Sequence, residues 1–193
     1  RLILVPSLLR AMLTVFSSLS GQGNGKSAPL LGDKLPHLKY WTTSGEALSF
    51  DLMGAFFNAA PDAVLLNLYG STEVAADVTC AEYPSKASAD IARNNASSSI
   101  VPIGTAIDNC GFLVLDPDTL EEIVEDERSS TKSSINHYAE NDADVSADNG
   151  GVGEIFVFGA NLAQGYVNRP ELDEAAFVTL CPIDTRGTAR RKF

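Results

Sequence analysis

The chain has 193 residues, of which 45% are hydrophobic and 20% charged, a composition typical of a folded globular protein. Its formal net charge of −11 and the lack of a basic stripe argue against nucleic-acid binding. No run of 18 apolar residues suggests a membrane span, and three widely separated cysteines predict a reducing, cytoplasmic environment rather than a disulfide framework or a zinc site.

Residues 1–84 are predicted to form an α/β lobe. Apolar runs typical of buried strands alternate with stretches whose apolar residues recur every three or four positions, as on one face of a helix. This alternation predicts a parallel sheet with right-handed crossover helices. Because the chain begins within the first apolar run, we expect an internal fragment of a longer domain. The expected strands are residues 2–5, 38–43 and 63–68, and the expected helices are residues 6–20 and 50–60.

A glycine-rich stretch after the first helix resembles a phosphate-binding loop. Residues 20–27 nearly match the pattern GxxxxGK[ST], but Ser20 occupies the first glycine position. The stretch also follows a helix, whereas a phosphate loop lies between a strand and a helix whose N-terminus faces the phosphates. A flexible loop is therefore the better interpretation.

The second half of the chain has a different character. Residues 85–99 are small and polar and predict a linker, whereas residues 100–180 contain short β-like runs that predict a small antiparallel sheet or barrel. Residues 125–150 are acidic, rich in serine and nearly free of apolar side chains, which predicts a disordered insertion. Residues 181–193 predict an irregular tail. The β-like runs are residues 101–107, 111–115, 121–124 and 153–158.

The segment from Asn67 to Glu73 carries the residue types that suit a nucleotide. It directly follows an apolar strand, at the sheet edge where open α/β sheets bind ligands. Tyr69 is able to stack on a base, and Gly70 allows close approach of the backbone. Thr72 is able to donate to a phosphate oxygen, and Glu73 is a hard oxygen ligand suited to Mg²⁺. A glycine-containing turn with a buried tyrosine explains the same residues without a ligand.

Four segments, in order along the chain, resemble motifs of the adenylate-forming superfamily, which includes acyl-CoA synthetases, luciferases and nonribosomal peptide synthetase adenylation domains. Residues 67–73 resemble its N-x-Y-G-x-T-E core, and residues 153–177 resemble its later G-E…G-Y…R-P…F motif, with Asp173 where Thr is usual. Residues 43–48 are similar to its G-G-E-x-L turn, and residues 101–104 to its x-P-(I/L)-G segment. Within the superfamily, the chain resembles acyl-activating enzymes related to aminoadipate-semialdehyde dehydrogenase.

This resemblance implies the first domain of such an enzyme in part, with a parallel α/β lobe followed by a small antiparallel β-barrel. It also implies roles for individual residues, with Thr72 and Glu73 as the catalytic pair. The implied residues are Gly45, Glu46, Ala47, Asn67 and Tyr69 for adenine; Gly70 for close approach of the backbone to ATP; Thr72 for phosphate; Glu73 for Mg²⁺; Thr42, Ser44, Leu68, Ala76 and Asp77 for the acyl or amino-acid pocket; and Gly153, Glu154, Gly165 and Tyr166 for the shape of the β subdomain.

The implied reaction is attack of a carboxylate on the α-phosphate of ATP, assisted by Mg²⁺, with a small carboxylic or amino acid as substrate and a phosphopantetheine carrier or CoA as the acceptor. The family's upstream P-K-G loop, its Y-x-T-G-D motif and its C-terminal catalytic Lys are not found in this sequence. We therefore expect the chain alone to be a poor catalyst. Two alternatives stay open: a catalytically incomplete remnant of such an enzyme, and an unrelated α/β binding domain.

Overall fold

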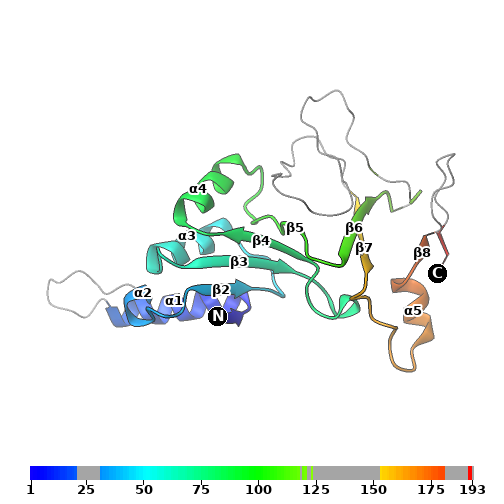
Figure 1. Cartoon of the computed structure of the whole chain (residues 1–193), viewed down its shortest axis with the longest axis horizontal. Helices are drawn as coiled ribbons and strands as arrows, with labels where there is room; N and C mark the ends of the chain where they lie inside the picture. Colours follow the sequence, from blue (N-terminus) through cyan, green and yellow to red (C-terminus); the bar gives the residue numbers. More distant parts are fainter. Residues whose placement is uncertain (21–30, 118, 121–122, 124–152, 181–190, 193) are drawn as a thin grey trace. The chain divides into compact units, whose positions relative to one another are not determined.

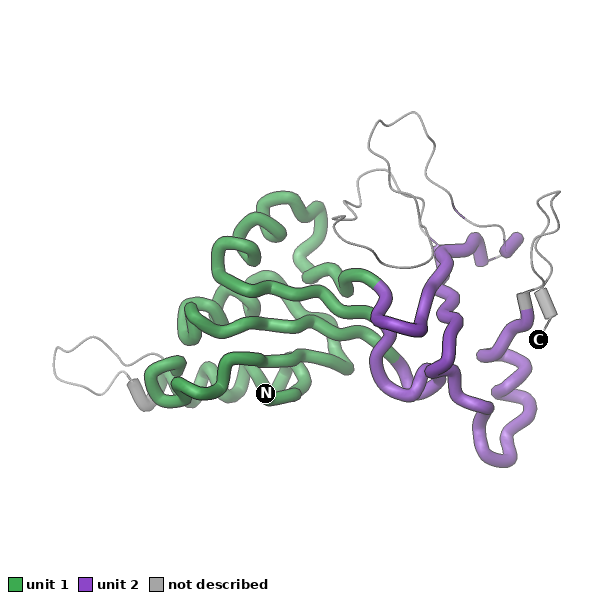
Figure 2. Tube along the Cα trace, viewed as in Figure 1, with its two compact units in different colours: residues 1–70, 79–105 green, residues 71–78, 106–193 purple. Residues whose placement is uncertain are grey.

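The computed structural model describes residues 1–20, 31–117, 119–120, 123, 153–180 and 191–192 (Figure 1). The predicted acidic insertion, most of the phosphate-loop lookalike and most of the predicted tail lie outside the described residues. The chain divides into two compact units (Figure 2). Unit 1 comprises Arg1–Gly70 and Thr79–Thr105, and unit 2 comprises Ser71–Val78 and Ala106–Phe193.

A mixed sheet forms the framework of unit 1. The three expected strands are present and are parallel, because each is joined to the next by a segment that contains a helix. A fourth strand, β4, then runs antiparallel to β3, so the expectation of a purely parallel sheet is wrong. The loop between β3 and β4 is too short for a parallel crossover, which needs a dozen or more residues. The strands, in the order in which they pair, are β1 (Leu2–Leu4), β2 (Tyr40–Thr43), β3 (Val64–Tyr69), β4 (Thr79–Tyr83) and β5 (Thr105–Ala106).

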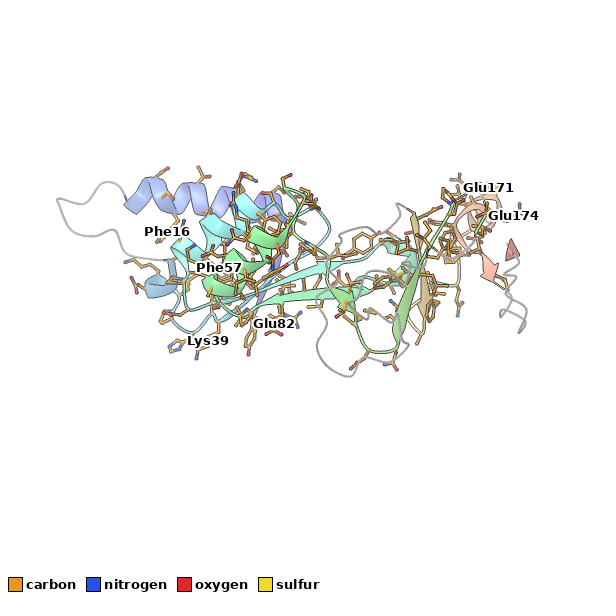
Figure 3. All side chains as sticks on the ribbon, turned by 90° about the horizontal axis from the view of Figure 1, so that it is seen from above. Phe16, Lys39, Phe57, Glu82, Glu171 and Glu174 are labelled. Carbon is orange, nitrogen blue, oxygen red and sulfur yellow. The ribbon has the colours of Figure 1, made fainter. Side chains whose placement is uncertain are left out.

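Helices α1, α3 and α4 gather on one side of this sheet (Figure 3). The core lies between these helices and the sheet, where Trp41, Phe56 and Phe57 are almost completely buried and pack edge to face. Glu82 lies on the opposite side of the sheet from Phe57 (Figure 3). None of the described helices is long and apolar enough to cross a membrane. The helices of unit 1 are α1 (Pro6–Ser20), α2 (Leu31–Lys34), α3 (Phe50–Ala59) and α4 (Lys86–Asn95).

Helix α4 occupies the stretch that the sequence predicts as a linker. Ser85 and Ser88 form a reciprocal capping box at its N-terminus, which satisfies backbone donors that the first turn leaves unpaired. Its buried side is made of alanine rather than of large apolar residues, and Ala89 is 3% exposed. Alanine is the best helix former but gives a weak hydrophobic pattern, so the prediction failed here. The α/β unit therefore extends to Thr105 instead of ending at residue 84.

Unit 2 is built around an antiparallel pair, β6 with β7, which confirms the expectation of a small antiparallel sheet. Gly111 on β6 leaves room for the ring of Phe158, since a Cβ atom there would stand 2.3 Å from that ring. A second pair joins β8 to β9, so the described strands of this unit form two-stranded sheets rather than a barrel. The elements are η1 (Thr72–Val74), β6 (Cys110–Leu115), β7 (Glu154–Gly159), α5 (Pro170–Ala176), β8 (Thr179–Leu180) and β9 (Arg191–Lys192).

Candidate functional site

The end of β3 is held by a buried amide. Asn67 is 3% exposed, its Oδ1 accepts a hydrogen bond from the Thr43 hydroxyl at 3.2 Å, and its Nδ2 donates to the Pro102 carbonyl at 3.0 Å. Thr43 lies opposite Asn67 on the neighbouring strand β2. The side chain that opens the candidate nucleotide loop therefore ties two strands to a segment 35 residues further along the chain. A buried amide that is hydrogen-bonded through both its oxygen and its nitrogen favours a single arrangement of the backbone.

Residues 99–104, which we call the strap, run from the start of α3 to β4. The Phe50 N–H donates to the Ser99 carbonyl at 3.1 Å, and the Val101 N–H donates to the Leu48 carbonyl at 2.8 Å. At the far end of the strap, Gly104 has φ +83°, and a Cβ atom there would stand 2.1 Å from the Cys80 carbonyl oxygen. The x-P-I-G resemblance thus corresponds to a segment that locks the carboxyl end of β3 in place.

Tyr69 is the accessible residue at this end of β3. Its side chain is 39% exposed, in contrast to the buried Asn67 two positions earlier, so its ring is available for stacking. Leu68 is half-buried on the opposite face of the strand. A cavity of about 360 Å³ in unit 1 lies at the other end of these strands, because its walls include Lys39 and Ala63, which immediately precede β2 and β3.

The turn after β2 carries the three residues that the family resemblance implies for the adenine face. Gly45 has φ +84°, which favours glycine at this position. Glu46 accepts hydrogen bonds from the backbone N–H of Ser7 at 2.9 Å and from the Ser7 hydroxyl at 2.8 Å. Its carboxylate therefore caps the N-terminus of α1, where it is also favoured by the helix dipole. Ala47 is exposed beside it.

The expected acyl-pocket residues are not equally accessible in this chain. Thr42 is fully buried, and its hydroxyl accepts a hydrogen bond from Arg1 Nε at 3.3 Å. The Ser44 N–H donates to the Leu4 carbonyl at 3.3 Å, which extends the pairing of β1 with β2. Both residues are therefore engaged in the sheet itself.

In unit 2, Glu73 lies within η1 and accepts hydrogen bonds from residues that are distant in the sequence. Its carboxylate accepts a hydrogen bond from the Tyr166 hydroxyl, and its backbone carbonyl accepts one from the Ala163 N–H at 2.7 Å. The hydrogen bond from Tyr166, and a weaker one from Ser71, lower the pKa of Glu73. The same contact with Glu73 raises the pKa of Tyr166. At neutral pH the pair is therefore an ionised carboxylate with a neutral phenol as its donor.

The turn that follows η1 has an unusual backbone. Ala75 and Ala76 have φ of 54° and 130°, values that alanine seldom adopts. The adjoining Thr72 is exposed, and Asp77 is half-buried. Strained non-glycine residues cluster at functional loops, so this turn is a reasonable place for ligand contacts.

The described residues contain no group of three or more His, Cys, Asp or Glu side chains that would enclose a metal ion. Glu73 is nevertheless suited to Mg²⁺, which is commonly bound through one or two carboxylates together with substrate phosphates and water. Its lowered pKa keeps it charged, as a ligand must be. The residues fit a magnesium ion that arrives with a nucleotide, and not a metal held by the protein alone.

Asp173, the departure from the family motif, shapes the segment that carries Tyr166. Its Oδ1 accepts a hydrogen bond from the Tyr166 N–H at 2.7 Å. Gly165 has φ +135°, and a Cβ atom there would stand 2.7 Å from the Asp173 carboxylate. The Tyr166 ring packs edge to face on Phe177, with 6.0 Å between ring centroids. The sequence indicated a structural role for Gly165 and Tyr166 but gave no sign of the contact between Tyr166 and Glu73.

The sequence profile of the AMP-binding enzyme family matches residues 2–167. The beta-alanyl-bioamine nonribosomal peptide synthetase ebony of Drosophila melanogaster is 36% identical over 170 residues, 87% of this chain and 15% of that protein. Enterobactin synthase component F of Escherichia coli K12 is 32% identical over 174 residues, 90% of this chain and 10% of that protein. The chain thus spans a small part of the length of these relatives.

Two solved structures resemble the chain along nearly its whole length. PA1221, described as a nonribosomal peptide synthetase protein containing adenylation and PCP domains, is 25% identical with a TM-score of 0.55, over 97% of this chain and 32% of that one. The N-terminal subdomain of Klebsiella oxytoca NpsA, in complex with 3-hydroxybenzoyl-AMSN, is 20% identical with a TM-score of 0.56, over 98% and 35%. The second likeness is one of fold alone.

Proposed function

Because the chain belongs to the AMP-binding enzyme family, we propose that it contributes nucleotide-binding residues to an enzyme that activates a carboxylic or amino acid as its adenylate. The alternative of an unrelated α/β binding domain is wrong. The observation that carries the proposal is the loop after β3. Asn67, near the end of β3, fixes the start of this loop through two hydrogen bonds, and Glu73 offers a charged carboxylate held by Tyr166.

The reaction needs no protein nucleophile. An oxygen of the acid's carboxylate attacks the α-phosphorus of ATP, the bond from that phosphorus to the bridging oxygen breaks, and pyrophosphate leaves with the electron pair. The protein acts by positioning the reactants and by stabilising phosphate charge. Mg²⁺, when bound, supplies most of that charge neutralisation.

We assign the residues of the chain as follows. Tyr69 stacks on the adenine, whose other contacts come from Gly45, Ala47 and the amide of Asn67. Thr72 donates to a phosphate oxygen, and Glu73 holds Mg²⁺. Glu46 acts indirectly, because its carboxylate is engaged in capping α1. The acyl-pocket assignment of Thr42, Ser44, Leu68, Ala76 and Asp77, with Gly70 at the loop's tightest point, stays a proposal from the family resemblance.

The relatives suggest the fate of the adenylate. PA1221 contains adenylation and PCP domains, and ebony is named as a beta-alanyl-bioamine nonribosomal peptide synthetase. We therefore propose an amino acid or a similar small acid as the substrate, and a phosphopantetheine carrier as the acceptor in preference to CoA.

Calorimetric titration of ATP with Mg²⁺ into the purified chain tests this proposal. Stacking of a base on an aromatic ring contributes about 1–3 kcal/mol, so Tyr69→Ala is expected to weaken binding about 5- to 150-fold. Tyr40→Ala is the matched control, because this tyrosine is also exposed, at 50%, but lies at the start of β2. A folded chain that binds no ATP would instead indicate a remnant that kept the fold and lost the function.

A further inference from the structure

One segment of unit 2 contacts η1 through three hydrogen bonds. Asn161 Nδ2 donates to the Val74 carbonyl at 3.1 Å, the Ala163 N–H donates to the Glu73 carbonyl at 2.7 Å, and the Tyr166 hydroxyl donates to the Glu73 carboxylate. In all three, the segment supplies the donor and η1 supplies the acceptor. We call residues 161–166 the clamp. Its contacts join positions about ninety residues apart in the sequence, since the Tyr166–Glu73 separation is 93.

The clamp controls both the backbone and the side chain of one residue. The hydrogen bond from the Ala163 N–H to the Glu73 carbonyl holds the backbone of η1. The hydrogen bond from the Tyr166 hydroxyl then orients the Glu73 carboxylate. Tyr166 is itself oriented on two sides, by its N–H bond to Asp173 at 2.7 Å and by its ring contact with Phe177. A donor that is held in place by these two contacts restricts its partner more than a freely rotating hydroxyl would.

We propose that Tyr166 is a positioning residue that holds the Glu73 carboxylate in one orientation for the magnesium–nucleotide complex. The motif of residues 153–177 then acts through the motif of residues 67–73. The inference rests on the proposed function for its ligand, but the orientation itself is a property of the free chain. Without this hydroxyl, a glutamate side chain rotates among several rotamers, and a single charged ligand loses part of its affinity for the metal.

The first arm of the test uses the full chain without nucleotide. NMR couplings of the Glu73 side chain, identified by their loss in Glu73→Gln, report its rotamers. We expect a single rotamer in the parent chain and in Tyr40→Phe, and rotamer averaging in Tyr166→Phe. The phenylalanine keeps the ring that packs on Phe177 and removes only the hydroxyl. Unchanged couplings in Tyr166→Phe overturn the proposal, whatever the chain binds.

The second arm measures ATP affinity by calorimetry, once with Mg²⁺ and once with EDTA. A hydrogen bond of this kind corresponds to about a two- to tenfold change, so Tyr166→Phe should reduce the Mg²⁺-dependent gain in affinity by that factor and leave the affinity in EDTA unchanged. In the Glu73→Gln background the same change should have no further effect, because the hydroxyl acts through Glu73.

These outcomes separate the two proposals. An equal loss of affinity with and without Mg²⁺, or an undiminished effect in the Glu73→Gln background, overturns the positioning role while the proposed function stands. If the parent chain binds no ATP, the proposed function fails for this chain. The positioning role for a magnesium–nucleotide complex fails with it, and the rotamer measurement then decides only whether Tyr166 orients Glu73.

Discussion

Replacing Gly104 by alanine should destabilise unit 1 by an amount that the structure allows us to bound. Its φ of +83° is costly for any residue with a Cβ atom, by about 1–2 kcal/mol. The new methyl would also stand 2.1 Å from the Cys80 carbonyl oxygen, which is backbone and cannot rotate away. Relieving such an overlap costs about a further 1–3 kcal/mol. We expect a loss of about 2–5 kcal/mol in the free energy of unfolding.

Gly54→Ala is the matched control, and the expected sign is opposite. Gly54 lies inside α3, and a Cβ atom there would meet only the end of the Arg93 side chain at 3.8 Å, an ordinary contact. Alanine is favoured over glycine within a helix by about 0.5–1 kcal/mol. Urea unfolding followed by circular dichroism measures both variants. Stability of Gly104→Ala within about 0.5 kcal/mol of the parent, or a shift of both variants in one direction, would refute the reasoning about the strap.

Three further predictions concern the loops around the sheet and the clamp. Glu46→Ala should lower the unfolding free energy by about 0.5–1 kcal/mol, because it removes the cap on Ser7, and Glu46→Gln should recover part of that loss in the same urea titration. Asn67→Leu should cost about 1–3 kcal/mol, since it removes the hydrogen bonds of the Asn67 amide to the Thr43 hydroxyl and to the Pro102 carbonyl; a neutral result would contradict the role assigned to these hydrogen bonds. The stability difference between the parent and Tyr166→Phe should depend on pH at both extremes. Because the pKa of Glu73 is lowered, the stabilisation by its ionised carboxylate is present above the usual pKa of 4.5 and is lost as the pH falls through the lowered pKa. Because the pKa of Tyr166 is raised, the stabilisation by its neutral hydroxyl is present below the usual pKa of 10.0 and is lost as the pH rises through the raised pKa. A difference that stays constant from pH 3 to pH 11 would show that the hydrogen bond contributes nothing.

The parts of the fold that the sequence predicted are those with a strong hydrophobic period. The strands around Trp41 and Leu65 are apolar runs, and Ser49 is a capping residue with Asp51 in the first turn, so β2, β3 and α3 were expected at nearly their observed bounds. Helix α4 was missed because its buried face consists of alanine. The antiparallel direction of β4 was not predicted. Strand direction depends on the length of the preceding loop, and the apolar pattern of Thr79–Tyr83 carries no information about that length.

The sequence proposes positions for the candidate site but does not give the contacts of their side chains. The order of motifs identified Tyr69 and Glu73, yet whether a carboxylate faces a ligand or a helix is decided by tertiary contacts. Glu46 illustrates this, because its role as a cap on α1 depends on Ser7, 39 residues earlier. Tyr166 illustrates the converse, since a residue expected only to shape the β subdomain proves to be the hydrogen-bond donor to Glu73.

The division of the chain has a consequence for how it is dissected. The backbone passes between the two units three times, at Gly70–Ser71, Val78–Thr79 and Thr105–Ala106. A single cut in the sequence therefore cannot yield both units intact: severing the chain at residue 105 leaves η1 on one product and the clamp on the other. During synthesis, likewise, Glu73 emerges from the ribosome long before Tyr166 exists to contact it. A fragment that ends between these two residues therefore contains η1 without the residues that hydrogen-bond to it.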